Sequence, residues 1–185
     1  MDKIFEILKE VIDICETNKI QYWVVGGYAV DAKKGYLSRK HGDIDLCIHQ
    51  NDMEKSLKIF YKNNFKITKE GLKYVFYKSN MKVDIFELFP NGEFYERRRE
   101  WFNAKYPKEM FDNFQILKLE ELKFRIPSNE GLRYYGSKTT HSEDSQFTNN
   151  LPYNEEIFSK IEYNEFADYK ESKKNVKTKI LTFDK

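Results

Sequence analysis

Three aspartates have a spacing that could build a cation site. Asp43 and Asp45 are separated by one residue at the start of DIDLCI, a run with the composition of a strand. Because side chains alternate along a strand, both carboxylates point to the same face. Two carboxylates about 4 Å apart repel each other by roughly 1–4 kcal/mol unless a cation lies between them. The pair therefore indicates a divalent cation site, and magnesium is the usual ion beside phosphates.

The third carboxylate, Asp84, lies in the later strand pattern KVDIF. Alternation puts Val83 and Ile85 on one face and Asp84 on the other. Taken alone, Asp84 fits an exposed strand residue. If its strand shares a mixed sheet with the paired aspartates, Asp84 becomes a third ligand or the base that takes the proton of an acceptor hydroxyl.

Phosphate-binding features precede the paired aspartates. Gly26 and Gly27 lie between a predicted strand and a predicted helix, where bare N–H groups and the positive helix end favour phosphate. The same glycines also fit an ordinary tight turn. Arg39 and His41 stand in the basic stretch before the aspartates, where they could contact a triphosphate or belong to a solvated loop.

The elements that must position these residues form a regular series in the first half of the chain. Apolar periodicity and turn residues predict, in order, helix 1–18, strand 21–25, helix 28–34, strand 44–48, helix 53–63 with Asn51 or Asp52 as N-cap, and strands 65–69, 73–78 and 82–88. We therefore expect an α+β fold with a mixed β-sheet flanked by helices.

The pattern weakens after Pro90. We predict an irregular segment over 93–113, a short strand over 114–117, helical pieces over 119–125 and 128–135, and a half-helical tail whose end, 170–179, is solvated or frayed. For the aromatic residues of this region, packing in a core or lid is favoured over stacking on a base or acceptor; they are Phe94, Tyr95, Trp101, Phe102 and Tyr106. The change of pattern after Pro90, together with the position of the three aspartates before it, predicts a catalytic core over 1–90 and an irregular and helical region over 91–185.

Composition restricts the class of protein. The 185 residues are 40% hydrophobic and 16% aromatic, which excludes a disordered chain and allows one domain with a small appendage at most. The net charge of +2 gives no global attraction to nucleic acid or membrane. Cys15 and Cys47 lie in apolar runs typical of buried free thiols, and His49 and His141 lack metal-ligand spacing. No run reaches the roughly 20 apolar residues of a membrane span, so we expect a cytoplasmic protein.

The block GGYAVDAKKGYLSRKHGDIDL joins these features in one order, followed by the later aspartate. This order resembles the nucleotidyltransferase superfold shared with polymerase β. Over residues 3–89 the sequence is most similar to aminoglycoside 2''-nucleotidyltransferases and their lincosamide relatives. The resemblance implies that Asp43, Asp45 and Asp84 bind two Mg²⁺ ions and that Asp84 is also the general base. It further implies that Gly26 and Gly27 hold the triphosphate, with Arg39 and His41 nearby. Asp31 would have a structural or substrate-orienting role.

The resemblance also implies an activity. Such an enzyme would move a nucleoside monophosphate from a nucleoside triphosphate, such as ATP, to a hydroxyl of a small molecule and release pyrophosphate. The region after residue 90 would shape the acceptor pocket, and an antibiotic acceptor would make the protein a resistance factor. The partners are then a nucleoside triphosphate and a small molecule, with no stable nucleic acid and no membrane, and the protein is a monomer or a homodimer.

Four alternatives stay open from the sequence. VDIF and IPSNEGLRYYG are also similar to the choline-phosphotransferase and fukutin-related family, which shares the fold and uses CDP-linked donors. That family has a longer acidic run before its DID motif, which RKHGDID lacks. A toxin-type nucleotidyltransferase that modifies a protein or tRNA is a second alternative. The third is a noncatalytic nucleotide-binding module, against which the three intact carboxylates argue. The fourth is a structural protein whose acidic residues merely face water.

Overall fold

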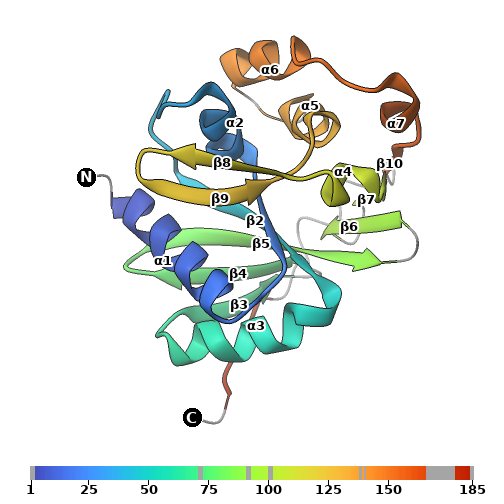
Figure 1. Cartoon of the computed structure of the whole chain (residues 1–185). Helices are drawn as coiled ribbons and strands as arrows, with labels where there is room; N and C mark the ends of the chain where they lie inside the picture. Colours follow the sequence, from blue (N-terminus) through green and yellow to red (C-terminus); the bar gives the residue numbers. More distant parts are fainter. Residues whose placement is uncertain are drawn as a thin grey trace.

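Nine of the described strands form one mixed sheet (Figure 1). The computed structural model describes residues 3–70, 73–90, 93–99, 102–137, 139, 141–165 and 178–183, and only the backbone of 90, 93–99, 102–104 and 163–165. The strands of this sheet are β1 (Tyr22–Val25), β2 (Asp43–His49), β3 (Lys66–Glu70), β4 (Lys73–Lys78), β5 (Met81–Pro90), β6 (Glu93–Arg99), β7 (Phe102–Pro107), β10 (Glu162–Glu165) and β11 (Thr178–Leu181).

Helices lie around this sheet and a separate hairpin. The helices are α1 (Lys3–Thr17), α2 (Gly26–Lys34), α3 (Gln50–Lys62), α4 (Glu109–Asp112), α5 (Asn129–Ser137), α6 (Ser142–Asn149) and α7 (Glu155–Ser159). The hairpin pairs β8 (Gln115–Leu119) with β9 (Leu122–Ile126). The predicted α+β class with a mixed sheet flanked by helices is confirmed.

The sheet runs in the order β10-β7-β6-β5-β4-β3-β11, and β2 joins it on β5 and carries β1. The pairing of β2 with β5 is parallel, whereas the other recorded pairs are antiparallel. Parallel neighbours need a long crossover, and here the chain passes through α3, β3 and β4 between them. This crossover brings the two predicted acidic strands side by side.

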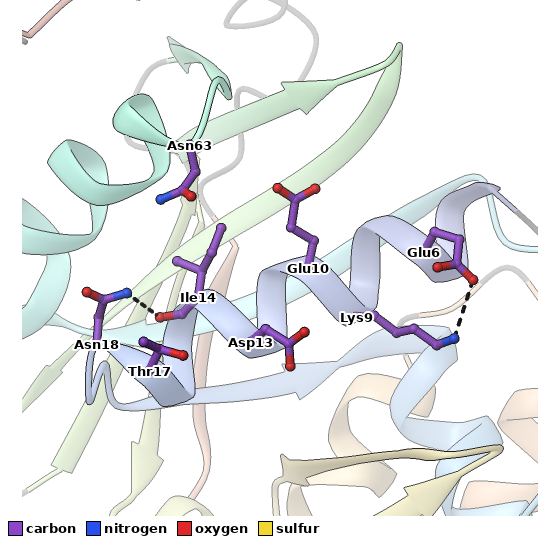
Figure 2. Close-up of a pocket in the computed structure, with 8 residues that line it drawn as sticks. All are labelled: Glu6, Lys9, Glu10, Asp13, Ile14, Thr17, Asn18 and Asn63. Carbon is purple, nitrogen blue, oxygen red and sulfur yellow. Dashed lines mark hydrogen bonds and ion pairs between the residues drawn. The ribbon is translucent and has the colours of Figure 1, made fainter.

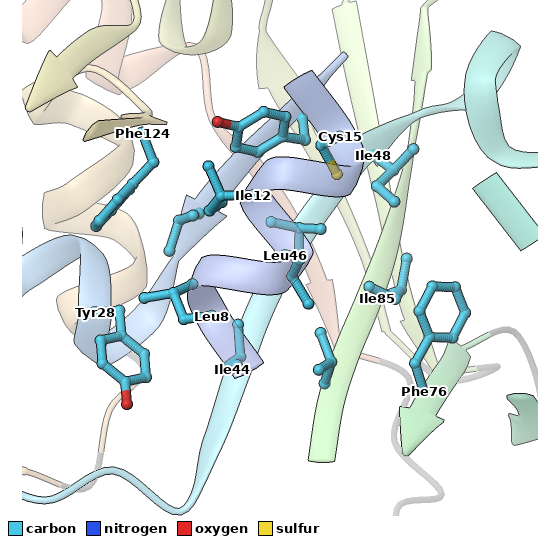
Figure 3. Close-up of a cluster of buried hydrophobic side chains, with 14 of the residues drawn as sticks. Leu8, Ile12, Cys15, Tyr28, Ile44, Leu46, Ile48, Phe76, Ile85 and Phe124 are labelled. Atoms are coloured by element: carbon cyan, nitrogen blue, oxygen red, sulfur yellow. The ribbon is translucent and has the colours of Figure 1, made fainter. Parts of the chain in front are cut away.

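Strict alternation along β2 and β5 separates the core from the acidic side chains. Ile44, Leu46 and Ile48 of β2 are completely buried in the main core, together with Val83 and Ile85 of β5. Figure 3 shows α1 packed over this face of the sheet, with its apolar side chains beside those of β2. The opposite face holds a second apolar cluster under α4 and α5. The acidic residues must lie on this second face, since they occupy the other parity.

The helix predicted over 119–125 is wrong, because this segment forms the second strand of the hairpin. Leu122, Phe124 and Ile126 point inward and the lysine and arginine between them point outward, which is a period of two. Two glutamates make the turn, and Glu120 takes a positive φ of 51°. The helix predicted over 128–135 is confirmed as α5, and the strand predicted over 114–117 corresponds to β8.

The irregular segment predicted over 93–113 is also wrong. It forms β6, β7 and α4, because β5 continues to Pro90 and its extension pairs with β6. Charged residues interrupt the apolar alternation by which a strand is recognised in sequence. Tyr106 is completely buried against Phe111 and Tyr134, so core packing is confirmed for this ring. The side chains of Phe94, Tyr95 and Phe102, and all of Trp101, lie outside the described residues.

Two predicted helix starts are also corrected. The second helix begins at Gly26 rather than Tyr28, and α3 begins at Gln50 rather than Met53. The N-cap of α3 is His49, whose Nδ1 accepts a hydrogen bond from the amide of Asn51 at 3.2 Å. The side chain of Asp52 instead accepts from the Gln21 amide, which ties α3 to the chain before β1.

The remaining predictions concern the tail and the cysteines. Thr178 and Lys179 lie in β11, which pairs with β3 and contradicts a frayed end there, and residues 170–177 lie outside the described residues. Cys15 and Cys47 are buried and free, as predicted. Within the described part of the chain, no helix is long and apolar enough to cross a membrane.

Candidate active site

The structure places the three aspartates on one face of the sheet. Asp43 and Asp45 share the face of β2 opposite the main core, and the parallel register makes Asp84 of β5 the direct partner of Asp45. Asp43 is exposed, Asp45 is half-buried and Asp84 is buried. The carboxylates therefore form a gradient from solvent to interior across two neighbouring strands.

The N-terminus of α2 lies against this acidic face. β1 pairs with β2 so that Val25 is opposite Asp45, and the helix starts at the next residue. Gly26 has a φ of +67°, and a side chain at this position would collide with the Asp45 carboxylate. A Cβ on Gly27 would lie 2.5 Å from both Arg39 Nη2 and His41 Nδ1. The absence of a side chain is thus required by the surroundings of both glycines.

His41 is held by a buried carboxylate. His41 Nε2 lies 2.6 Å from Asp31 Oδ2, and the hydroxyl of Ser38 donates to Asp31 Oδ1 at 2.5 Å. Asp31 has no exposed surface, and the ring of Tyr28 covers the imidazole with centroids 4.1 Å apart. These contacts fix the ring so that Nδ1 faces Gly27. The position of Asp31 agrees with the structural or orienting role that the sequence resemblance implied.

Asp84 is paired with two lysines. Asp84 Oδ2 lies 2.7 Å from Lys73 Nζ and 2.8 Å from Lys82 Nζ, and Lys82 also approaches Asp43 at 3.9 Å. Asp84 Oδ1 is buried and has no hydrogen-bond partner. The carboxylate is therefore anchored through one oxygen, and its other oxygen is left to a proton or a ligand.

The two lysines respond differently to the same carboxylate. Burial lowers the pKa of Lys73, and the attraction of Asp84 does not compensate. Burial also acts to lower the pKa of Lys82, but the hydrogen bond and charge of Asp84 outweigh it and raise that pKa. The side chain of Lys73 is 12% exposed and that of Lys82 34%, so the larger desolvation at Lys73 accounts for the difference.

A pocket of about 300 Å³ opens over this face. Its lining includes six predicted site residues, Gly26, Gly27, Arg39, His41, Asp43 and Asp45, whereas Asp31 and Asp84 are not part of it. Tyr135, Thr139 and His141 also line it, from α5 and the segment that leads into α6, and sequence reasoning missed all three. No local pattern marks them, because they reach the site only through the packing of α5 and α6.

The oxygen donors on this face of the sheet suit magnesium. Asp43, Asp45 and Asp84 offer hard carboxylate oxygens on one face, and Asp84 Oδ1 is a buried acceptor without a partner, which suits Mg²⁺. Among the described residues, no three histidines, cysteines or carboxylates are gathered closely enough to hold a metal.

A larger pocket of about 460 Å³ lies elsewhere, along α1 (Figure 2). Carboxylates and amides line it, and its polar contacts include Lys9 with Glu6, Lys78 with Glu10 and the Asn18 side chain with the Ile14 carbonyl. It contains no glycine turn and no helix N-terminus. Size alone would favour this pocket, but the chemistry needed to bind a triphosphate is found in the smaller one.

Similar solved structures share this fold. The fold is similar to that of ANT(2'')-Ia in complex with adenylyl-2''-tobramycin, with a TM-score of 0.61 and 18% identity over 79% of this chain and 87% of that chain. It is equally similar to the lincosamide antibiotic adenylyltransferase LnuA with bound lincomycin, with a TM-score of 0.61 and 20% identity over 80% of this chain and 97% of that chain. The fold is the nucleotidyltransferase fold.

The sequence comparisons give the family. The sequence profile of aminoglycoside-2''-adenylyltransferases matches residues 7–146, which is more than half of the chain. A comparison with curated protein sequences finds no match. The chain belongs to the aminoglycoside-2''-adenylyltransferase family and is a nucleotidyltransferase.

Proposed function

We propose that this enzyme transfers a nucleoside monophosphate from a nucleoside triphosphate to a hydroxyl of an aminoglycoside- or lincosamide-type antibiotic, with magnesium, and releases pyrophosphate. The observation that carries the proposal is the parallel pairing of Asp45 with Asp84 beside the N-terminus of α2. The acceptor class is suggested by the family and by the ligands of the similar structures, adenylyl-2''-tobramycin and lincomycin.

The nucleotide half of the proposed site is the start of α2. The amides of Gly26 and Gly27 would donate to the triphosphate, which the positive end of the helix also attracts. The guanidinium of Arg39 and the His41 ring, both beside Gly27, would meet the remaining phosphate oxygens. ATP is the donor that the family description favours.

Asp43, Asp45 and Asp84 would hold magnesium, as two ions. When bound, magnesium would neutralise charge on the triphosphate and lower the pKa of the attacking hydroxyl. The three carboxylates increase in burial from exposed Asp43 through half-buried Asp45 to buried Asp84, so they would contact the ions at different depths. The lysines on Asp84 Oδ2 keep this carboxylate oriented while Oδ1 receives its ligand or a proton.

Asp84 Oδ1 is also the atom we assign as general base. It has no hydrogen-bond partner, so it can accept the proton of the acceptor hydroxyl without breaking a bond. Tyr135, Thr139 and His141 line the side of the pocket built by the C-terminal region and would hold the acceptor there. On this proposal residues 1–90 are the catalytic core and residues 91–185 shape the acceptor site.

The proposal includes where and with what the enzyme works. It would act in the cytoplasm, where nucleoside triphosphates and Mg²⁺ are available, as a monomer or a homodimer. The partners are small molecules, because the net charge of +2 provides no general attraction to nucleic acid. Modification of its acceptor would make the protein an antibiotic resistance factor.

The test is pyrophosphate release with Mg²⁺ and each of the four nucleoside triphosphates, against a panel of aminoglycosides and lincosamides. Asp43→Ala and Asp45→Ala remove the proposed ligands and should abolish release. Asp13→Asn, on an exposed position of α1, is the matched control for loss of one carboxylate and should behave as wild type.

Release that requires both an acceptor and the two aspartates would support the proposal and identify the substrate. An Asp43→Ala or Asp45→Ala variant with normal turnover would contradict the metal assignment. Silence across the panel together with turnover of CDP-choline or CDP-ribitol would assign the phosphotransferase activity instead.

A further inference from the structure

A buried carboxylate of α6 holds Arg39, which lines the candidate active site. Asp144 is 2% exposed, its Oδ2 accepts a hydrogen bond from Arg39 Nε at 3.0 Å, and the same oxygen forms an ion pair with Nη2 at 3.0 Å. Its Oδ1 accepts from Lys34 Nζ at 2.9 Å. Both oxygens of Asp144 therefore have partners. Asp144 is more than one hundred positions from Lys34 and Arg39 in the sequence, and the three side chains meet beside α2.

These contacts determine the orientation of the guanidinium. Arg39 Nε and Nη2 lie on Asp144, and Nη1 donates to the Lys40 carbonyl at 3.2 Å. Because the guanidinium is planar, fixing three nitrogens fixes the whole group. Its Nη2 lies so close to Gly27 that a Cβ there would be 2.5 Å away. The arginine is therefore held at the N-terminus of α2, where the triphosphate is proposed to bind.

The charges of this group differ from those of the rest of the pocket. Lys34 and Arg39 bring two positive charges to the single negative charge of Asp144, whereas Asp43 and Asp45 bring two negative charges to the same pocket. Burial acts to raise the pKa of the Asp144 carboxyl, but the hydrogen bonds from Lys34 and Arg39 outweigh it and hold this pKa below its ordinary value. The carboxylate stays charged, and the guanidinium keeps its partner.

Stability alone gives a poor account of this arrangement. A buried ion pair can often be replaced by apolar side chains with little loss of stability, because desolvation offsets much of the attraction. An ionic contact also gives something that an apolar contact does not, namely a defined direction for the donor groups. That direction is useful only if the guanidinium has a ligand to meet.

We infer that Asp144 is a positioning residue for the nucleotide, which acts by orienting Arg39 toward the triphosphate. The inference rests on the proposed function. It assigns α6, which belongs to the C-terminal region, a part in binding the nucleotide as well as any part that region has in binding the acceptor.

The test is a double-mutant cycle with Asp144→Asn and Arg39→Ala, read by calorimetric binding of a nonhydrolysable ATP analogue with Mg²⁺ and by the KM of each substrate. Asp144→Asn should weaken nucleotide binding about tenfold, and it should add little in the Arg39→Ala background, since the two residues act as one unit. The KM of the acceptor should change little.

Two controls separate positioning from support of the fold. Lys34→Met removes the other bond of Asp144 and keeps Arg39 in place, so nucleotide affinity should hold even if the melting temperature falls. Glu143→Gln removes a neighbouring exposed charge from α6 and should change neither. If Asp144→Asn fails to fold, Asp144→Glu keeps the charge but displaces the guanidinium, and the same loss of nucleotide affinity is expected.

An equal effect of Asp144→Asn with and without Arg39 would overturn the inference, and so would an equal loss of nucleotide binding in Lys34→Met. Wild-type protein that binds no nucleotide would overturn the proposed function and this inference together. Normal nucleotide binding by wild type and Asp144→Asn alike would overturn only the inference.

Discussion

At the level of single residues, the two carboxylate oxygens of Asp84 have different surroundings. Its Oδ2 is shared by two lysines, and its Oδ1 is buried without a partner. The lysines hold the carboxylate through Oδ2, and Oδ1 is left without a hydrogen-bond partner. The two oxygens therefore have different roles, because Asp84 lies on β5 directly beside Asp45 of β2 and is the more buried of the two residues.

We expect Asp84→Asn to retain nucleotide binding and to lose at least about 100-fold in turnover, because an amide cannot accept the proton of the hydroxyl. Nucleotide binding by calorimetry and steady-state kcat measure the two effects separately. Asp13→Asn on α1 is again the charge control. Weakened binding of Mg²⁺ with a modest loss of kcat would instead make Asp84 chiefly a metal ligand.

Gly26 gives a second prediction at this scale. Gly26→Ala should destabilise the protein by roughly 1–3 kcal/mol and abolish transfer, because the positive φ is strained for alanine and the new Cβ collides with Asp45. Gly35 is the matched control, since its φ is also positive, at 85°, and it has nothing within 4 Å of an added Cβ.

Urea unfolding measures the stability of the Gly26→Ala and Gly35→Ala variants, and transfer kinetics measure their activity. Gly35→Ala should lose stability and keep its activity per folded molecule. Similar activity in the two variants would show that the close approach of α2 to Asp45 is unimportant for catalysis.

At the scale of secondary-structure elements, α3 depends on an unusual N-cap. His49 ends β2, and its ring nitrogen accepts a hydrogen bond from the amide of Asn51, two residues further along the chain. An accepting Nδ1 must carry no proton, so the cap works only with the neutral imidazole. Burial lowers the pKa of His49 despite the opposing charges of Asp52 and Asp112.

This cap should make stability depend on pH. The folded-state pKa of His49 lies below the unfolded value of about 6.5, so the unfolded chain binds the proton more readily and stability falls as the pH drops below this value. Replacing the ring by His49→Asn keeps a capping oxygen and removes the titration. Urea midpoints between pH 7.5 and 5 should fall for wild type more than for His49→Asn, and parallel slopes would contradict the assignment.

At the scale of the whole molecule, one core joins both halves of the chain. Phe124 of β9 is 1% exposed and belongs to the same apolar cluster as α1 and the central strands (Figure 3). Leu119, Ile126 and Leu132 from the second half are buried in this cluster as well. The two regions predicted on either side of residue 90 therefore share one hydrophobic core, and the boundary divides only their proposed roles.

Phe124→Ala should destabilise the whole protein by about 3–5 kcal/mol in a single transition, because it leaves a cavity at the centre of the shared core. Phe114, 39% exposed before β8, provides the matched control, and Phe114→Ala should cost far less. Denaturation followed by both fluorescence and circular dichroism measures the change. Two separate transitions would show that the halves unfold independently.

The sequence by itself determined the elements whose signal is local. The apolar face of α1, the alternation of β2 and β5 and the order of elements through β5 were all readable, since each depends on neighbours a few residues away. The same alternation put Asp43, Asp45 and Asp84 opposite the core. The resemblance of this block then gave the family, which the profile match confirms.

Tertiary structure alone decided the contacts between distant segments. The parallel register of Asp45 with Asp84, the two lysines on Asp84 and the bond of Asp144 to Arg39 join strands and helices that no local period relates. The strands β6 and β7 were missed because they form by pairing with an existing sheet edge rather than by burying an alternating apolar face. Pairing is a property of two segments, and a pattern within one segment cannot specify its partner.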